Sequence, residues 1–165
     1  MILLDDLAPY FDALFEPQQE KIDFLYQIFL DDFLNNPFSI DNKKVNIKSY
    51  PSTLKGFEKY CESFVHIITW KSKMTGRRVF DYQRANRVHW IRPILEQRSD
   101  PRIKYFQFTE SDGAFRDYYW YDNKNYIVIV EQITKEYLLI TGFVIDKGNR
   151  NRFQKRYENY LGSLK

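Results

Sequence analysis

The sequence has very little cysteine, histidine or glycine, and each shortage argues against a class of site. Its 165 residues contain one cysteine, Cys61, so no disulfide can form within the chain. One cysteine and two histidines give no zinc-ligand spacing, and no paired acidic motif for magnesium stands out. The six glycines form no phosphate-binding loop. We therefore expect a protein that uses no metal and no cofactor.

Long apolar runs are also missing. No stretch approaches the ~20 apolar residues that span a bilayer. The N-terminus lacks the basic start and the apolar run of a signal peptide. Together with the single cysteine, these absences favour a cytoplasmic protein that does not contact a membrane.

Aromatic residues are abundant, and charge is distributed unevenly. Aromatics make up 18% of the chain, which is enough for a large core. Residues 1–41 hold nine acids and one base, a net charge of −8, whereas the remainder holds 24 bases and 13 acids, a net charge of +11. A body of this charge attracts polyanions such as RNA through its long-range field and counterion release. The alternative is a basic surface that only maintains solubility.

Apolar spacing and turn residues predict an α+β fold. Residues 1–37 show helical spacing interrupted by Pro17, which predicts an acidic helical hairpin. Residues 38–165 are predicted to form a basic α+β domain with a strand at 64–71 and a kinked helix at 80–97. Short turns then predict a four- or five-stranded antiparallel sheet with helices packed on one face. Its last strands are expected at 103–109, 115–121, 126–132 and 137–145, followed by a basic helix at about 151–161.

His66 interrupts an apolar pattern. Period-two alternation in the expected strand places His66 on the face of Phe64, Ile68 and Trp70. Histidine is the natural acid or base at neutral pH. A titratable group on an apolar row indicates either a functional residue or a hydrogen-bonded core histidine, and both interpretations remain open.

Two arginines and one threonine are further candidates. In the expected helix 80–97, Arg84 falls in the apolar stripe and Arg87 borders it, whereas His89 points away. Buried arginine is rare unless it pairs with an acid or binds an anion, so an anion site and a structural ion pair are both possible. Thr141 lies on the expected inner face of its strand, where it either fills the sheet or directs its hydroxyl at a phosphate.

Basic residues near aromatic ones predict contacts with nucleic acid. Arg116 shares a strand face with Trp120, a pairing typical of sites that hold unstacked bases and phosphates. The basic loop that begins at Lys71 and the terminal helix are expected to contact backbone phosphates. The residues concerned in that loop and helix are Lys71, Arg150, Arg152, Lys155 and Arg156. The alternative for all of them is a solvated surface.

Four segments together resemble a known family. They are Ser63-Phe-Val-His66-Ile-Ile-Thr69, Arg84-Ala-Asn-Arg87-Val-His-Trp90-Ile-Arg-Pro-Ile-Leu-Glu96, Tyr137-Leu-Leu-Ile-Thr141-Gly-Phe and Lys155-Arg-Tyr157-Glu158. This pattern resembles small phage- and prophage-associated proteins that are similar to the barnase–EndoU–colicin–RelE-like group of ribonucleases. The resemblance covers about residues 56–160 and excludes the acidic segment.

The resemblance implies a metal-independent endoribonuclease that leaves a 2′,3′-cyclic phosphate. The residues that match its catalytic positions are His66, Arg84, Arg87 and Thr141. Gly142 and Phe143 depart from the pattern, which has alanine and tyrosine there. Three hypotheses follow: a ribonuclease of phage or toxin type, an RNA-binding module without catalysis, and an interaction or inhibitor protein that binds a partner protein through residues 1–37.

Overall fold

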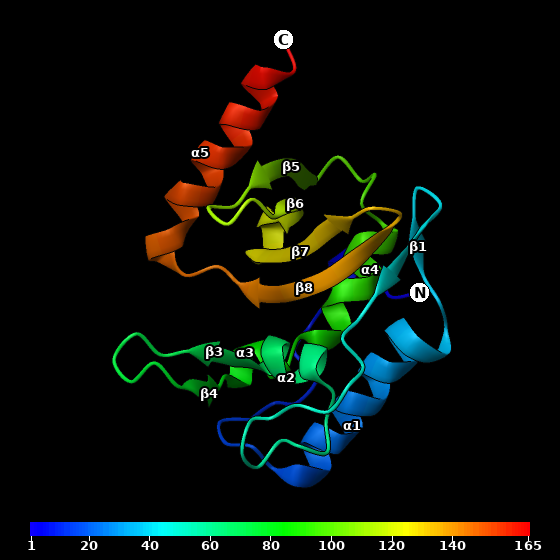
Figure 1. Ribbon diagram of the computed structural model, residues 1–165, viewed down its shortest axis with the longest axis vertical. Coiled ribbons are helices and arrows are strands. Elements are labelled where there is room, and N and C mark those ends of the chain that lie inside the picture. The colour runs from blue at the N-terminus through cyan, green and yellow to red at the C-terminus, as the bar shows by residue number, and fades with distance from the viewer.

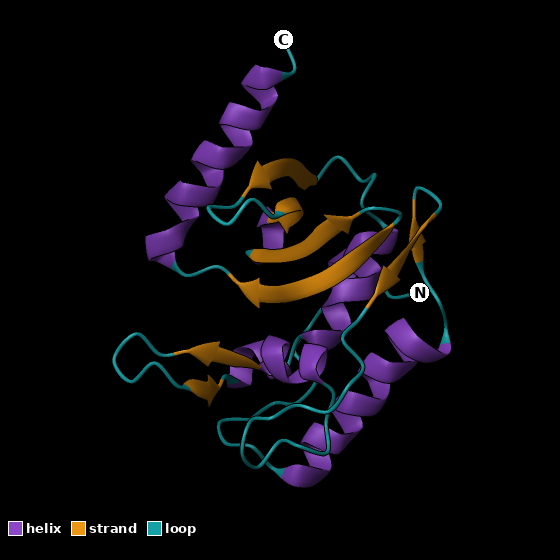
Figure 2. Cartoon of the chain, viewed as in Figure 1, coloured by secondary structure: helices purple, strands orange, loops and turns teal.

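The computed structural model describes every residue, 1–165, and has an α+β fold with five α-helices (Figures 1 and 2). The first part of the chain forms α1 (Gln19–Leu30), β1 (Ser39–Ile40), β2 (Lys43–Asn46), α2 (Glu62–Ile68), β3 (Thr69–Lys71), β4 (Arg78–Phe80), α3 (Tyr82–Ala85) and α4 (Ile91–Glu96). The second part forms β5 (Ile103–Thr109), β6 (Phe115–Tyr121), β7 (Tyr126–Ile133), β8 (Glu136–Val144) and α5 (Lys147–Ser163). The four predicted late strands are confirmed to within one residue.

The main sheet has six strands in the order β1-β2-β8-β7-β6-β5. Strands β5 to β8 pair antiparallel with their neighbours because short turns join them. Strand β2 pairs parallel with β8, with Val45 opposite Tyr137, so the sheet is mixed and larger than predicted. Strands β3 and β4 form a separate two-stranded arm (residues 69–80) that projects from the body (Figure 1).

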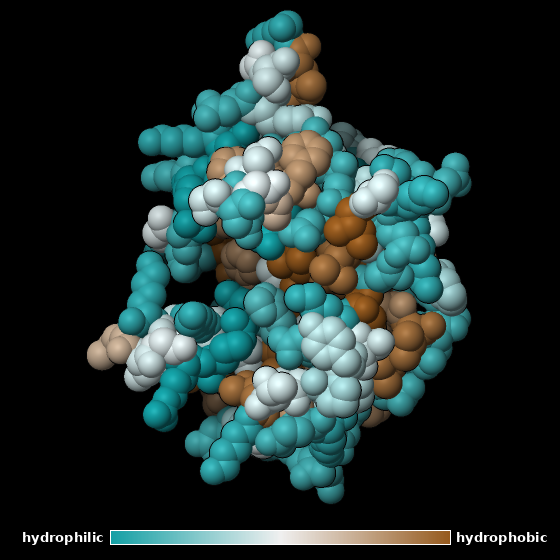
Figure 3. Space-filling view, viewed as in Figure 1, coloured by the Kyte–Doolittle hydropathy of each residue, from teal (hydrophilic) through white to brown (hydrophobic).

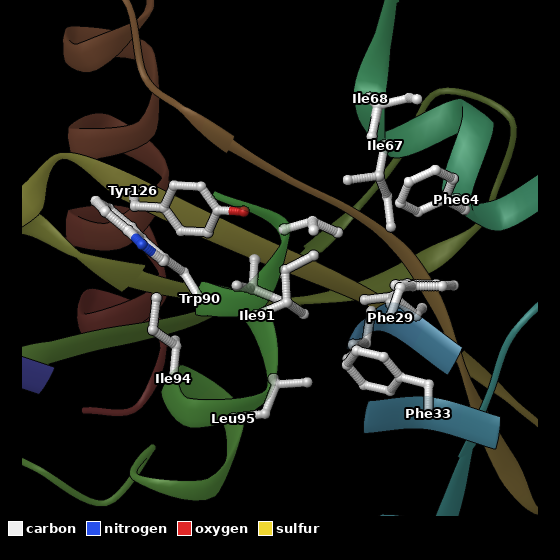
Figure 4. Packing of buried hydrophobic residues seen from close by; sticks show 14 of the residues in the cluster. Phe29, Phe33, Phe64, Ile67, Ile68, Trp90, Ile91, Ile94, Leu95 and Tyr126 are labelled. Atoms are coloured by element: carbon white, nitrogen blue, oxygen red, sulfur yellow. The ribbon is translucent and has the colours of Figure 1, made fainter. Parts of the chain in front are cut away.

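Helices cover both faces of the sheet, not one face as predicted. Alternate residues of β6 belong to different apolar clusters: Tyr119 packs with Ile91 of α4, whereas Tyr118 and Trp120 pack with Phe153 of α5. Since successive strand residues point to opposite faces, α5 lies on the face opposite α4. Figure 4 shows the larger cluster, where side chains of α1, α2, α4 and the sheet meet.

The predicted N-terminal hairpin is only partly present: its second helix is α1, which follows Pro17, whereas residues 7–18 form no helix. Asn86 accounts for part of the difference. It accepts hydrogen bonds from the backbone N–H groups of Tyr10 (2.9 Å) and Phe11 (2.7 Å) and donates to the Phe11 carbonyl (2.7 Å). These tertiary bonds occupy backbone groups that a helix would pair internally. The apolar residues of the segment lie in the main core.

Two further predictions are wrong. The predicted strand 64–71 is mostly helix α2, with only its end in β3. Four side chains of its apolar run are buried at helical spacing. A run this short fits the period of a strand as well as that of a helix. The predicted helix 80–97 is broken into β4, α3, a 3-10 turn at Val88–Trp90 and α4. No helix of the protein is both long and apolar enough to cross a bilayer.

Candidate functional site

A pocket of about 200 Å³ lies between α2 and β8, and we call it the His66 pocket. Its lining residues are Lys48, Glu62, Ser63, His66, Arg116, Leu139 and Ile140. It sits beside β8, whose second half has no partner strand on that side, since β2 pairs only with Tyr137 and Leu138. The surface is also hollowed between the sheet with α5 and the β3–β4 arm (Figure 3).

His66 lies in the last turn of α2 and is half-buried. Burial lowers its pKa to about 4, and positive charges on Arg78, Arg84, Lys48 and Arg116 act in the same direction. The imidazole is therefore neutral at pH 7. No protein group hydrogen-bonds to its ring, so it is not the bonded core histidine that was one of the two interpretations of the sequence.

The cations around His66 have different roles. Arg78 donates to the carbonyls of His66 (2.9 Å) and Thr69 (3.0 Å), and Arg84 also reaches the Thr69 carbonyl (3.3 Å). Both guanidiniums thus satisfy carbonyls at the end of α2 that have no partner within the helix. Arg84 lies over the Phe143 ring at 4.8 Å and pairs loosely with Asp81 at 3.7 Å.

Lys48 and Arg116 bring charge from other elements. Lys48 makes no ion pair, and its backbone N–H donates to Ser63 Oγ (2.7 Å), which fixes its loop to α2. Arg116 pairs with Glu131 at 3.1 Å and lies 3.9 Å from Glu110, so its charge is partly balanced. Two cations, Lys48 and Arg116, line the pocket with one acid, Glu62, and Arg78 and Arg84 add positive charge from just outside the lining. The pocket is therefore suited to an anion next to a neutral imidazole.

The structure brings only part of the expected catalytic set together. His66 and Arg84 are neighbours, and Arg116 joins them. Arg87 lies elsewhere: it donates to the Gln83 carbonyl (3.1 Å) and lines a different pocket with residues of the N-terminal segment. Thr141 is buried, and its hydroxyl has no partner.

Gly142 has a structural reason to be glycine. A Cβ at this position would lie 2.6 Å from the Tyr126 hydroxyl and 2.8 Å from Ile91 Cγ1. The close approach that glycine allows is therefore to the core, not to a ligand.

The expected RNA-contacting residues also differ in their accessibility. Trp120 is fully buried, and Lys104 and Arg150 lie over its ring at 4.5 Å and 5.4 Å, so it offers no face to a base. Arg150 pairs with Asp122 at 2.8 Å. Arg156 stacks on Phe108 at 3.6 Å and donates to the Tyr118 hydroxyl. The remaining cations, Arg152, Lys155 and Lys71, are exposed and make no ion pair.

Three pocket residues were missed by sequence reasoning. Glu62 and Ser63 precede His66 in α2, and Glu62 lies one helical turn before it, on the same side of the helix. That spacing is a usable signal only if the segment is assigned to a helix. Lys48 lies in a loop, and nothing in its neighbourhood of the sequence indicates that it faces α2.

Comparisons with known proteins add no assignment. No protein-family model matches the chain, and neither a curated protein sequence nor a solved structure is significantly similar to it. No group of three or more potential metal ligands occurs in the structure.

Proposed function

We propose that this chain is a metal-independent endoribonuclease of phage or toxin type that binds an RNA phosphate in the His66 pocket. The observation that carries the proposal is a neutral imidazole with no internal hydrogen bond in a pocket that Lys48 and Arg116 also line, with Arg78 and Arg84 close enough to act on its charge. Such a ring is unprotonated at pH 7 and has free nitrogens to which a proton can be transferred, and the nearby cations stabilise negative charge that develops beside it. The likeness to phage-associated ribonucleases in sequence points in the same direction.

In the proposed reaction, the RNA 2′ oxygen attacks the adjacent phosphorus. His66 accepts the 2′ proton, because its low pKa keeps the ring unprotonated in the free protein. Lys48, Arg84 and Arg116 stabilise the charge on the phosphorane oxygens. The bond from phosphorus to the 5′ oxygen breaks, solvent supplies a proton to that oxygen, and the products are a 2′,3′-cyclic phosphate and a 5′-hydroxyl.

The direct test is incubation of purified protein with single-stranded RNA in EDTA, followed by analysis of the product ends. We expect cleavage with cyclic phosphate ends, loss of cleavage in His66→Gln, and a large loss in Lys48→Met. Lys55→Met is the matched control, because Lys55 is an exposed lysine outside the pocket. Intact RNA with the wild type, or equal cleavage by His66→Gln, contradicts the proposal.

A binding module without catalysis is the second candidate, and two observations favour it. The Thr141 hydroxyl is buried, and Phe143 has no hydroxyl and is covered by Arg84. A site that lacks both late-strand hydroxyls can still bind an anion through its charge, but it has fewer groups that take part in catalysis. This candidate predicts that RNA binds with strong salt dependence and is recovered uncut.

A partner protein at residues 1–37 is a separate proposal. Tyr10, Phe15 and Phe24 are exposed there, and the nearby acids Asp12 and Glu16 make no ion pair. An exposed aromatic surface with an acidic rim suits a partner that carries apolar and basic side chains. The double variant Phe15→Ser, Phe24→Ser tests it, since both side chains are exposed. Unchanged partner binding by this variant contradicts the proposal.

A further inference from the structure

The β3–β4 arm is a defined structure and not a loose loop. Trp70 lies opposite Val79 and Lys71 opposite Arg78 in its antiparallel ladder. The connecting turn is closed by backbone hydrogen bonds from Ser72 to the Arg77 carbonyl and from Gly76 to the Ser72 carbonyl, both 2.8 Å. In Figure 1 the arm extends away from the sheet and the helices.

The arm carries charge of one sign. Residues 69–80 contain four cations and no acid. One of them, Arg78, is bound to the end of α2. The side chains of the other three, Lys71, Lys73 and Arg77, are exposed and make no ion pair or hydrogen bond. Such a row of unpaired cations favours a polyanion as its partner.

Trp70 is the accessible tryptophan of the protein. Its exposed fraction is 41%, and its cross-strand neighbour Val79 is 39% exposed, whereas Trp90 and Trp120 are buried. Trp70 and Val79 therefore form an apolar face that is partly open to solvent. An exposed aromatic ring between unpaired lysines and arginines is the arrangement that stacks unpaired bases and holds their backbone.

The arm begins at the His66 pocket. Arg78 joins the base of the arm to the His66 carbonyl, and Arg84 bonds to the first residue of β3, Thr69, from the other side. The surface is hollowed between the arm and the sheet (Figure 3). The pocket and the arm are thus adjacent, and cations without ion pairs lie at both, Lys48 in the pocket and Lys71, Lys73 and Arg77 on the arm.

We propose that Trp70 is a stacking platform for a base of a single-stranded RNA, and that the arm holds this strand while its phosphate occupies the His66 pocket. The inference rests on the proposed function, because it assigns the substrate of the same site. Bases in a duplex are stacked on one another and are not free to lie on an aromatic ring, so the arm selects unpaired RNA.

Tryptophan fluorescence tests the inference directly, since only Trp70 is exposed. A short single-stranded RNA with 2′-O-methyl groups serves as the probe, because it cannot be cleaved by 2′ attack. We expect it to quench the wild-type fluorescence, and expect a duplex of the same sequence to quench much less. With a labelled probe, fluorescence anisotropy should show about tenfold weaker binding by Trp70→Ala. Leu164→Ala, which removes an exposed apolar side chain outside the pocket lining and outside the arm, should bind like the wild type.

The outcomes separate this inference from the proposed function. Tight binding of the single strand without quenching, and with equal affinity in Trp70→Ala, overturns the role of Trp70 and leaves the His66 pocket as the RNA site. Equal quenching by the duplex overturns the preference for unpaired RNA. No binding of the single strand by the wild type overturns both proposals. Since Trp70 is exposed, circular dichroism should show that Trp70→Ala folds normally.

Discussion

At the scale of single residues, burial and nearby positive charge shift the pKa of His66 in the same direction. Both disfavour the imidazolium and lower its pKa to about 4, whereas the unfolded chain has a histidine pKa of about 6.5. Between these values the unfolded state binds more protons than the folded state. His66 therefore makes the folded protein less stable as the pH falls through this window. Burial raises the pKa of Asp32 to about 6, so this carboxyl has the opposite effect and makes the folded protein more stable as the pH falls.

Replacing His66 with Gln should remove part of the acid sensitivity. The wild type should lose about 1 to 2 kcal/mol more of its unfolding free energy than the variant between about pH 7 and about pH 4.5. The contribution of Asp32 is common to both proteins and cancels. Urea unfolding of the two proteins at both pH values measures the difference. An equal loss in both proteins would show that the folded pKa of His66 is normal.

Gly142 gives a prediction about packing. In Gly142→Ala the new methyl group meets Tyr126 and Ile91, which are both buried, so the unfolding free energy should fall by about 1 to 3 kcal/mol. Gly162→Ala is the matched control, because a methyl group there meets nothing within 4 Å and lies in α5. The control should leave stability unchanged or raise it by up to about 0.5 kcal/mol. Thermal unfolding of both variants makes the comparison, and equal stability would contradict the close packing at Gly142.

At the scale of elements, Arg78 joins α2 to the arm. Its guanidinium donates to two carbonyls and to Thr69 Oγ1 at the end of the helix. Arg78→Met removes the donor to the His66 carbonyl and to Thr69 Oγ1, while Arg84 still reaches the Thr69 carbonyl, and should lower the unfolding free energy by about 1 to 3 kcal/mol. Arg77→Met should have little effect, because the Arg77 side chain is exposed and unpaired. Hydrogen exchange should show faster opening of α2 and β3 in Arg78→Met alone.

The elements also show which parts of the fold the sequence predicts. Strands β5 to β8 were predicted closely because their alternation and turns are local signals. Helix α2 was not, because four buried residues in a short run fit a strand as well as a helix. The segment 80–97 breaks where Asn86 bonds to Phe11, a contact between residues 75 positions apart. No local pattern contains such information.

The same limit applies to the candidate site. His66 was chosen because it interrupts an apolar run, and the structure places it in a pocket, in a helix and not in the predicted strand. Arg84 and Arg87 were identified through a helical phase that the structure does not keep, and Thr141 through strand alternation. None of the three lines the pocket, although Arg84 lies close enough to act on the charge of His66. The contribution of Lys48 depends on how a loop folds against α2, and Ser63 Oγ makes that contact. The pocket is therefore a property of tertiary structure.

At the scale of the whole molecule, residues 1–37 are part of one core. Their buried residues Leu4, Leu7, Leu14, Ile22, Leu25, Phe29 and Phe33 belong to the same cluster as α2, α4 and the sheet. Removing seven large buried side chains at several kcal/mol each exceeds the stability of an ordinary domain. The fragment 38–165 should therefore lose cooperative thermal unfolding by circular dichroism. A fragment that melts cooperatively, with native secondary structure, would show that residues 1–37 are a separate domain.

The central claim is that an RNA phosphate lies against the imidazole of His66. Proton NMR measures it most directly, because the protein has two histidines and His66→Gln assigns the signal. The account predicts a His66 pKa of about 4 in the free protein. Saturation with a 2′-O-methyl RNA strand should raise it to about 5 or higher, since a nearby anion favours the imidazolium. A pKa that stays the same in the presence of bound RNA would contradict the account.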